Sequence, residues 1–294
     1  MRARSVRRVV ACVAVVAAAS SSCASDDTRG STDAQPSATT VVSATDSPTT
    51  TDPPRAPIWA DEFDGVAGAP PDPARWAFET GGTGWGNRQL EFSSDTHAVT
   101  DGEGHLVITS QPLDVTTAPP CWYGACHFMS SRLTTAGLAS WKYGRFEIRA
   151  AFPEGDATWP AFWMLGADID EVGWPAAGEI DVVEHVGRDG DVVRGTAHGP
   201  GYSASEGVSA RVDVEDVHDF HVYAVEWTAT SIAWFADGVE YHRIDKGDER
   251  EWVFDHQFHL VLNFAMGGLL GGEPSPLDFE RKAFTVDYVR VFTA

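Results

Sequence analysis

Basic residues are scarce in this 294-residue chain: Lys and Arg number 21 against 43 Asp and Glu, which gives a net charge of −22. A surface this acidic repels phosphate backbones, which argues against a nucleic-acid partner. No segment carries a long, capped pattern of period 3.6, which argues against a helical fold. The composition is otherwise ordinary, with 43% hydrophobic residues, 28 Gly and 17 Pro, and so excludes wholesale disorder, collagen and coiled coil.

The amino terminus has the pattern of an export signal. Arg residues within 1–8 precede the apolar run 9–19, which is too short to cross a membrane comfortably. Cys23 follows three Ser residues, and this end of the predicted signal 1–23 resembles a bacterial lipoprotein cleavage box, in which the Cys is lipidated. Ser20 stands where that box prefers an aliphatic residue, so cleavage to a soluble product remains the alternative. Either way we expect an exported protein, anchored at the cell surface or secreted, that meets the membrane only through such a lipid.

The next segment, 24–57, is rich in Ser, Thr, Asp, Pro and Ala and almost free of large apolar residues. Such a stretch cannot bury enough surface to offset its ordering entropy, so it is predicted to be a disordered linker. No comparable linker or internal repeat follows. The remainder, 58–294, is therefore predicted to form a single domain.

Cysteine is rare, with four in the chain. Cys12 and Cys23 fall in the signal region, which leaves Cys121 and Cys126 in the segment "APPCWYGACHF". In an exported protein this pair favours a small loop-closing disulfide. A metal site is less favoured, because only His127 lies nearby as a further ligand.

The predicted domain consists of β-strands almost throughout. Short runs rich in aromatic and branched residues occur at 105–110, 143–152, 219–228 and 284–292. Asp237-Gly238 separates two apolar runs, which is a strong hairpin signal. The pattern predicts an all-β, antiparallel fold and favours a two-sheet sandwich over a closed barrel.

One segment, "GEIDVVEHVG", concentrates acidic residues. Glu179 and Asp181 are two apart and lie on one face of a strand, whereas strict alternation would send Glu184 to the other face. A β-bulge between Asp181 and Glu184 brings Glu184 back beside the other two. The alternatives are an exposed strand decorated with acids and a cation site, but like charges on one face destabilise a strand unless something uses them.

The spacing of these acids also suggests a chemistry. With the bulge, the Cα atoms of Glu179 and Glu184 lie roughly 13 Å apart at 3.3 Å per residue, and their side chains can narrow the carboxyl separation to about 5 Å. That separation is typical of a retaining glycosidase, in which one carboxylate attacks the anomeric carbon and the other acts as acid and then base. Asp181 between them would help to keep the acid protonated.

This strand resembles the active-site strand of glycoside hydrolase family 16, in the bulged form typical of laminarinase-like endo-β-1,3-glucanases. The resemblance covers nearly the whole predicted domain and runs in the family's order. Its strings are "WADEFDG", "GWGNRQLEF", "YGRFEIRAAFPEG", "TWPAFWMLG", "GTAHGPGY", "FHVYAVEW", "LNFAMGG" and "VDYVRVF". It implies a jelly-roll (concanavalin-like) β-sandwich with the substrate in a concave cleft.

The resemblance also implies residue roles: Glu179 is the nucleophile, Asp181 the auxiliary acid and Glu184 the general acid/base. It implies sugar-holding polar groups at Asn87, Glu147, Arg149 and Asn263, aromatic cleft residues at Trp159, Trp163 and Trp174, and a cleft histidine at His198. Taken alone, each of these residues has a simpler explanation. Trp159 and Trp163 would be core residues, and Glu147 and Arg149 would form a surface ion pair. Asn263 and His198 would be buried hydrogen-bonding groups.

Many members of the family carry a structural calcium. The matching positions are Glu62 and Gly104, through backbone carbonyls, and Asp287, through its carboxylate, and oxygen ligands of this kind suit calcium. The Cys-flanked segment 121–135 departs from common laminarinases, and Trp122 or Tyr123 in it would narrow one subsite.

The expected function is therefore an exported, monomeric endo-glucanase that hydrolyses internal β-1,3 linkages of laminarin-type glucans with retention. It would need no cofactor for catalysis, only calcium as a structural ion. One alternative keeps the mechanism but changes the polymer to mixed-linkage β-glucan or galactan, or replaces hydrolysis by transglycosylation. The others are a non-catalytic glucan-binding protein and an envelope protein that uses the acids for cations.

Overall fold

The structure is a computed structural model that describes residues 56–247 and 249–294. The predicted signal 1–23 with Cys23, and the predicted linker up to residue 55, lie outside the described residues. Within the described residues, no helix is both long and apolar enough to cross a membrane.

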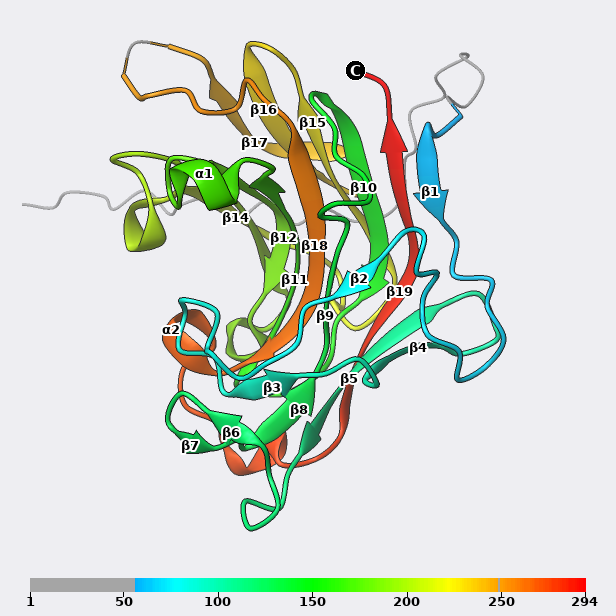
Figure 1. Cartoon of the computed structure of the whole chain (residues 1–294). Helices are drawn as coiled ribbons and strands as arrows, with labels where there is room; N and C mark the ends of the chain where they lie inside the picture. The colour runs from blue at the N-terminus through cyan, green and yellow to red at the C-terminus, as the bar shows by residue number, and fades with distance from the viewer. Residues whose placement is uncertain (1–55, 248) are drawn as a thin grey trace, which may run out of the picture. The chain divides into compact units, whose positions relative to one another are not determined.

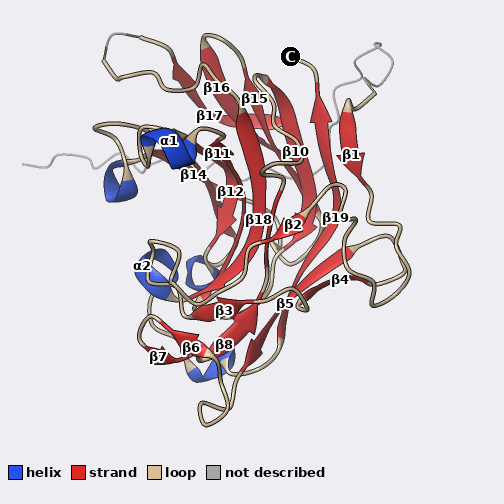
Figure 2. Cartoon of the chain, viewed as in Figure 1, coloured by secondary structure: helices blue, strands red, loops and turns tan. Residues whose placement is uncertain are grey.

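Two large sheets pack face to face (Figures 1 and 2). In order across the ten-stranded sheet lie β17 (Val239–Asp245), β16 (Ser231–Ala236), β15 (His221–Trp227), β10 (Gly144–Ala151), β19 (Lys282–Phe292), β5 (Leu106–Pro112), β8 (Phe128–Ser130) and β3 (Glu91–Ser93), with β1 (Trp59–Asp61) on β19 and β4 (Ala98–Thr100) on β5. In order across the seven-stranded sheet lie β14 (Val208–Asp213), β13 (Val192–His198), β12 (Glu179–His185), β11 (Thr158–Gly166), β18 (Phe258–Met266), β9 (Arg132–Thr134) and β2 (Ala77–Phe78). A separate small hairpin joins β6 (Pro120–Cys121) to β7 (Gly124–Ala125).

The two-sheet antiparallel sandwich predicted from the sequence is confirmed. One pair departs from it, since β3 and β8 run parallel. The predicted hairpin joins β16 to β17, and its turn residues Asp237 and Gly238 have φ values of 48° and 79°. A tight hairpin turn requires positive φ at both positions, which Asp and Gly adopt at low cost.

The core lies between the sheets because each strand alternates its side chains between two faces. On β10, Phe146, Ile148 and Ala150 are fully buried while the residues between them are partly exposed. On β12, Ile180, Val182 and Val183 enter the same apolar cluster from the other sheet. Burying a large apolar side chain contributes about 1.5–3 kcal/mol, so these inward faces hold the layers together.

Helices are short in the described chain. α1 (Ile169–Val172) and α2 (Gly268–Gly271) are single turns, accompanied by 3₁₀ turns at Gly187–Asp189, Ala204–Glu206 and Pro276–Asp278. Both α1 and α2 lie on the side of the seven-stranded sheet that faces away from β10 and β19 (Figure 1). The outer face of that sheet, between these two turns, carries the acidic residues of β12.

Candidate active site

The predicted bulge is present in β12. On one side Asp181 pairs with Thr196 and Glu184 with Arg194 of β13, so three steps on β12 match two on its neighbour. The pairing with β11 shifts at the same place. The extra residue turns both Val182 and Val183 toward the core and keeps Glu184 on the outer face with Glu179 and Asp181.

Each of the outer acids accepts a hydrogen bond from an indole N–H. Trp174 Nε1 donates to Glu179 Oε2 at 3.0 Å, and Trp159 Nε1 donates to Glu184 Oε1 at 2.8 Å. His198 Nε2 lies 3.2 Å from Asp181 Oδ2 and 3.7 Å from Glu179 Oε1. The predicted partners Trp159, Trp174 and His198 therefore meet the acids and fix their orientation.

The acids lie in a poorly solvated environment that resists ionisation. Burial and the neighbouring Asp181 raise the pKa of Glu179 to about 8. Burial and Glu184 raise the pKa of Asp181 well above its usual range, and burial raises the pKa of Glu184 against the opposing effects of Trp159 and Arg194. Three such carboxyl groups cannot all be ionised near neutral pH, so the cluster holds protons as a coupled unit.

The outer face of the seven-stranded sheet continues from β12 across β11, β18 and β9. Trp163 Nε1 donates to Asn263 Oδ1 at 2.7 Å, and Asn263 pairs across the strands with Arg132. The Arg132 guanidinium carbon lies 4.7 Å from the ring centre of Trp163 and 4.8 Å from that of Trp85. Predicted residues Trp163 and Asn263 thus share one face with the acids.

The comparisons with known proteins agree with this geometry. Residues 86–290 match the model of glycosyl hydrolases family 16. The chain is 42% identical over 253 residues to a beta-glucanase from Rhodothermus marinus, which covers 80% of this chain and 84% of that protein. This chain belongs to glycosyl hydrolase family 16. The family resemblance inferred from the sequence is confirmed. The prediction that the protein is a glycoside hydrolase is confirmed with it.

Other family 16 proteins are similar over nearly their whole length. A glucan endo-1,3-beta-glucosidase from Cryptopygus antarcticus is 34% identical over 260 residues, which covers 80% of this chain and 91% of that protein. The solved laminarinase catalytic domain from Thermotoga maritima MSB8 superposes with a TM-score of 0.75 at 40% identity, covering 82% of this chain and 98% of that one. That structure shares the two-sheet sandwich described above.

The prediction that Glu147 and Arg149 line the family 16 cleft is wrong. Both lie on β10 in the ten-stranded sheet, on the face opposite the buried Phe146 and Ile148, and so on the far side of the sandwich from Glu179. Glu147 accepts hydrogen bonds from Arg145 and Tyr288, and Arg149 pairs with Asp287. The side chains of β10 alternate between two faces as predicted. Which of the two sheets β10 joins depends on its pairing with distant strands, and this pairing puts Glu147 and Arg149 on the outer face of the ten-stranded sheet.

The residues predicted for a structural calcium on the convex side do lie away from the acids, since Asp287 belongs to β19 of the ten-stranded sheet. The Asp287 carboxylate, predicted as the charged ligand, is paired with Arg149, while the Glu62 carboxylate is paired with Arg290 at 2.6 and 2.8 Å. Gly104 adopts a positive φ of 94° in a turn. Since Arg149 already neutralises Asp287, these contacts do not fit a cation at that carboxylate. Within the described chain, three metal-ligand atoms gather only at Glu179, Asp181 and His198.

Asn87 lies in the loop between β2 and β3 that also contains Trp85. Its side chain is exposed, and its backbone carbonyl accepts a hydrogen bond from Leu269 of α2 at 2.8 Å. The structure therefore places Asn87 beside α2 rather than against the acids.

Two cleft residues, Trp85 and Arg132, are not among those predicted from the sequence. Trp85 stands in the family string "GWGNRQLEF", which is a usable signal, whereas Arg132 looks like an ordinary strand residue. Arg132 acquires its role through partners distant in the chain, including Glu79, which pairs with its Nε at 2.5 Å.

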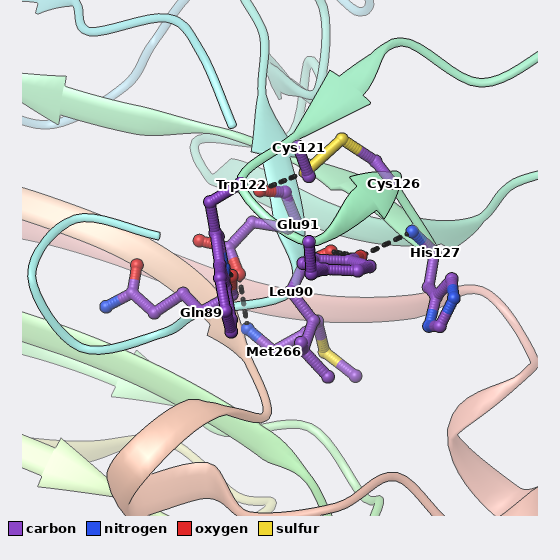
Figure 3. Close-up of a disulfide and its surroundings, with 9 residues drawn as sticks. Gln89, Leu90, Glu91, Cys121, Trp122, Cys126, His127 and Met266 are labelled. Carbon is purple, nitrogen blue, oxygen red and sulfur yellow. Dashed lines mark hydrogen bonds between the residues drawn. A yellow bond between two sulfur atoms is a disulfide. The ribbon is translucent and has the colours of Figure 1, made fainter. Parts of the chain in front are cut away.

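The predicted disulfide between Cys121 and Cys126 is formed, with an S–S distance of 2.07 Å (Figure 3). It closes the β6–β7 hairpin, which packs against the chain at 89–91.

Proposed function

We propose that the protein is a retaining endo-glucanase that hydrolyses internal β-1,3 linkages of laminarin-type glucans. The bulge in β12 carries this proposal, because it presents Glu179 and Glu184 on one face with Asp181 between them. The laminarinase and the endo-1,3-beta-glucosidase among the relatives support the choice of polymer.

In the first step, protonated Glu184 donates its proton to the glycosidic oxygen while the Glu179 carboxylate attacks the anomeric carbon. The C–O bond to the leaving sugar breaks, and a covalent glycosyl ester forms at Glu179. In the second step, Glu184 accepts a proton from water, the water oxygen attacks the anomeric carbon, and Glu179 leaves as a carboxylate. Two inversions give net retention, and neither step needs a redox cofactor.

Asp181 and His198 are assigned to positioning Glu179. Burial raises the pKa of Asp181 well above its usual range, so Asp181 can take up a proton and then donate a hydrogen bond to Glu179. Burial raises the pKa of Glu179 to about 8, and this bond and the Trp174 N–H oppose that effect by stabilising the negative charge that the nucleophile requires. Glu184 keeps the proton because burial disfavours its charged form.

The test is to incubate the full chain with purified laminarin, mixed-linkage β-glucan and galactan and to separate the products by chromatography. We expect internal cleavage of laminarin into oligosaccharides, and proton NMR at early times should show the β-anomer first. If laminarin stays intact while another polymer is cut, the substrate assignment is wrong and the mechanism stands. An α-anomer first would refute the two-step mechanism.

A non-catalytic glucan-binding protein is the competing proposal. It predicts that Glu179→Gln binds glucan like the parent and that neither cleaves it. Because the three acids and their indole partners are all present, we favour the enzyme.

Export is proposed from the terminal sequence, with mass spectrometry of the mature amino terminus deciding whether Cys23 is acylated. A monomeric state is proposed alongside it, to be measured by sedimentation. The ion pair of Asp287 with Arg149 argues against calcium at Glu62, Gly104 and Asp287, and metal analysis of the purified protein tests it.

A further inference from the structure

The disulfide hairpin fastens one loop of the cleft by its backbone. Trp122 Nε1 donates to the carbonyl of Gln89 at 2.8 Å, and Tyr123 Oη donates to that of Leu90 at 2.6 Å. The Cys121 sulfur lies 3.6 Å from the carbonyl of Glu91. Three successive hairpin residues thus contact three successive carbonyls (Figure 3), which fixes the end of the loop rigidly.

The same hairpin reaches the part of the loop that carries Trp85. The Trp122 backbone N–H donates to the carbonyl of Gly82 at 2.8 Å. The Trp122 indole lies over Gly84, where an added Cβ would come within 2.7 Å of the ring. Gly84 also has a φ of 76°, so glycine is required there for space and for conformation. Trp122 therefore lies against the turn that carries Trp85.

These residues extend a row that begins at the acids. From Asp181 on β12 the row passes through Trp163 on β11 and Asn263 on β18 to Arg132 on β9, and Trp85 lies on Arg132. Neighbouring strands are about 4.8 Å apart, so Arg132 lies three strand spacings, roughly 14 Å, from the acidic strand. Trp122 adjoins this row through Gly84, the residue that precedes Trp85.

Trp122 is 49% exposed although its indole N–H and its backbone N–H are both bonded. What remains available is the apolar face of a ring that is already held in one orientation. Exposed apolar rings that are fixed in advance bind a partner with little loss of entropy. The C–H face of a pyranose ring is an apolar surface of matching shape.

We propose that Trp122 is a distal sugar-binding platform that extends the cleft, with the Cys121–Cys126 hairpin as its rigid mount. The ligand is a sugar ring of the bound glucan, several units from the bond that is cut. This inference rests on the proposed function, since it assigns one more contact to the same polymer. It predicts that the contribution of Trp122 depends on the length of the substrate.

The experiment measures kcat and KM for the full chain with β-1,3-gluco-oligosaccharides of increasing length, from trimer to heptamer, and with laminarin. For Trp122→Ala we expect the ratio of its KM to that of the parent to rise with length, to about tenfold for the longest chains, which corresponds to about 1.4 kcal/mol. The kcat ratio should stay flat across the series. Trp122→Phe, which keeps a ring face but loses the bond to Gln89, should recover most of the affinity.

Phe279→Ala is the matched control, because Phe279 is 52% exposed and packs on Phe128 of β8, which belongs to the ten-stranded sheet and not to the sheet that carries the row. It should leave every KM unchanged. A Trp122→Ala ratio that is the same at all lengths, in a variant that melts like the parent, overturns the platform. If the parent cuts no β-1,3-glucan, the proposed function fails, and the length series is repeated with oligosaccharides of the polymer that it does cut. A flat ratio there overturns the platform as well.

Discussion

Two buried glutamates, Glu179 and Glu91, have a pKa raised to about 8, yet they lie in regions with different tasks. Glu179 shares its face of β12 with Asp181 and Glu184 and accepts a hydrogen bond from an indole N–H. Glu91 lies beneath the disulfide hairpin, where its carboxyl group feels the charge of Arg132 and accepts a hydrogen bond from the backbone N–H of Met266 at 2.8 Å (Figure 3). The raised pKa reports burial in both cases. Only at Glu179 do two further acids lie on the same strand face, and it is this cluster that indicates a catalytic site.

The largest effect is expected from the acidic cluster. Glu179→Gln removes the nucleophile and should lower kcat by more than about 10⁴-fold, while Glu184→Gln removes the acid/base and should lower it by about 10²–10⁴-fold. Both variants should fold, because a neutral amide replaces one of several crowded acids. Initial rates on laminarin, with thermal melting as the control for folding, check this. A Glu179→Gln variant that retains most of its kcat contradicts the assignment.

A change at Glu91 should alter stability and leave chemistry alone. In the folded protein burial raises the pKa of Glu91 to about 8, whereas the unfolded chain releases this proton near the ordinary pKa of 4.5. Between these values the folded state binds more protons, so the free energy of unfolding falls as pH rises, by at most about 1.4 kcal/mol per pH unit from this group. Glu91→Gln should therefore flatten this decline.

Denaturant unfolding of the parent and of Glu91→Gln at pH 5, 6, 7 and 8 measures the difference in slope. The three acids of the cleft keep their own contribution, so the decline should weaken rather than vanish. The kcat of the variant on laminarin should stay within about threefold of the parent. Equal slopes for both proteins would show that Glu91 is ionised when folded.

A smaller effect is expected where the cleft floor meets the hairpin loop. Trp163→Phe keeps the ring beside Arg132 but removes the N–H that bonds to Asn263. Losing one such bond costs about 1 kcal/mol, so KM should rise about fivefold with little change in kcat. Asn263→Ala removes the same bond by deleting its acceptor. The rise in KM of the double variant should not exceed the combined effects of the two single variants. A fall in kcat alone would place Trp163 in the chemical step.

The smallest effect should follow a change on the opposite face of the sandwich. Arg149→Met removes the ion pair with Asp287, which is partly exposed and therefore contributes no more than about 1 kcal/mol. Since Arg149 lies on the ten-stranded sheet, kcat and KM should equal those of the parent. A marked rise in KM would return Arg149 to the substrate site, against its position in the fold.

Much of the site can be inferred from the amino-acid sequence, because its signals are local. The period of two gives the faces of β10 and β12, and the surplus residue between Asp181 and Glu184 implies a bulge whenever all three acids must share a face. The disulfide between Cys121 and Cys126 is a local signal too, because the two residues are only five positions apart in the sequence. Trp159 and Trp163, four residues apart on one strand, fall on one face of β11 as expected, although Pro160 lies between them.

The sequence by itself determined the fold class and the shared face of the three acids, because these depend on alternation, turns and spacing within single segments. It also indicated the family, through eight strings that resemble family 16. Only the tertiary structure decided which sheet each strand joins. That placement moved Glu147 and Arg149 to the outer face, brought Arg132 between Trp85 and Trp163, and set the disulfide hairpin against the cleft loop. Strand pairing joins segments more than a hundred residues apart, as when β9 meets β18, and no local pattern encodes which strand a given edge will meet.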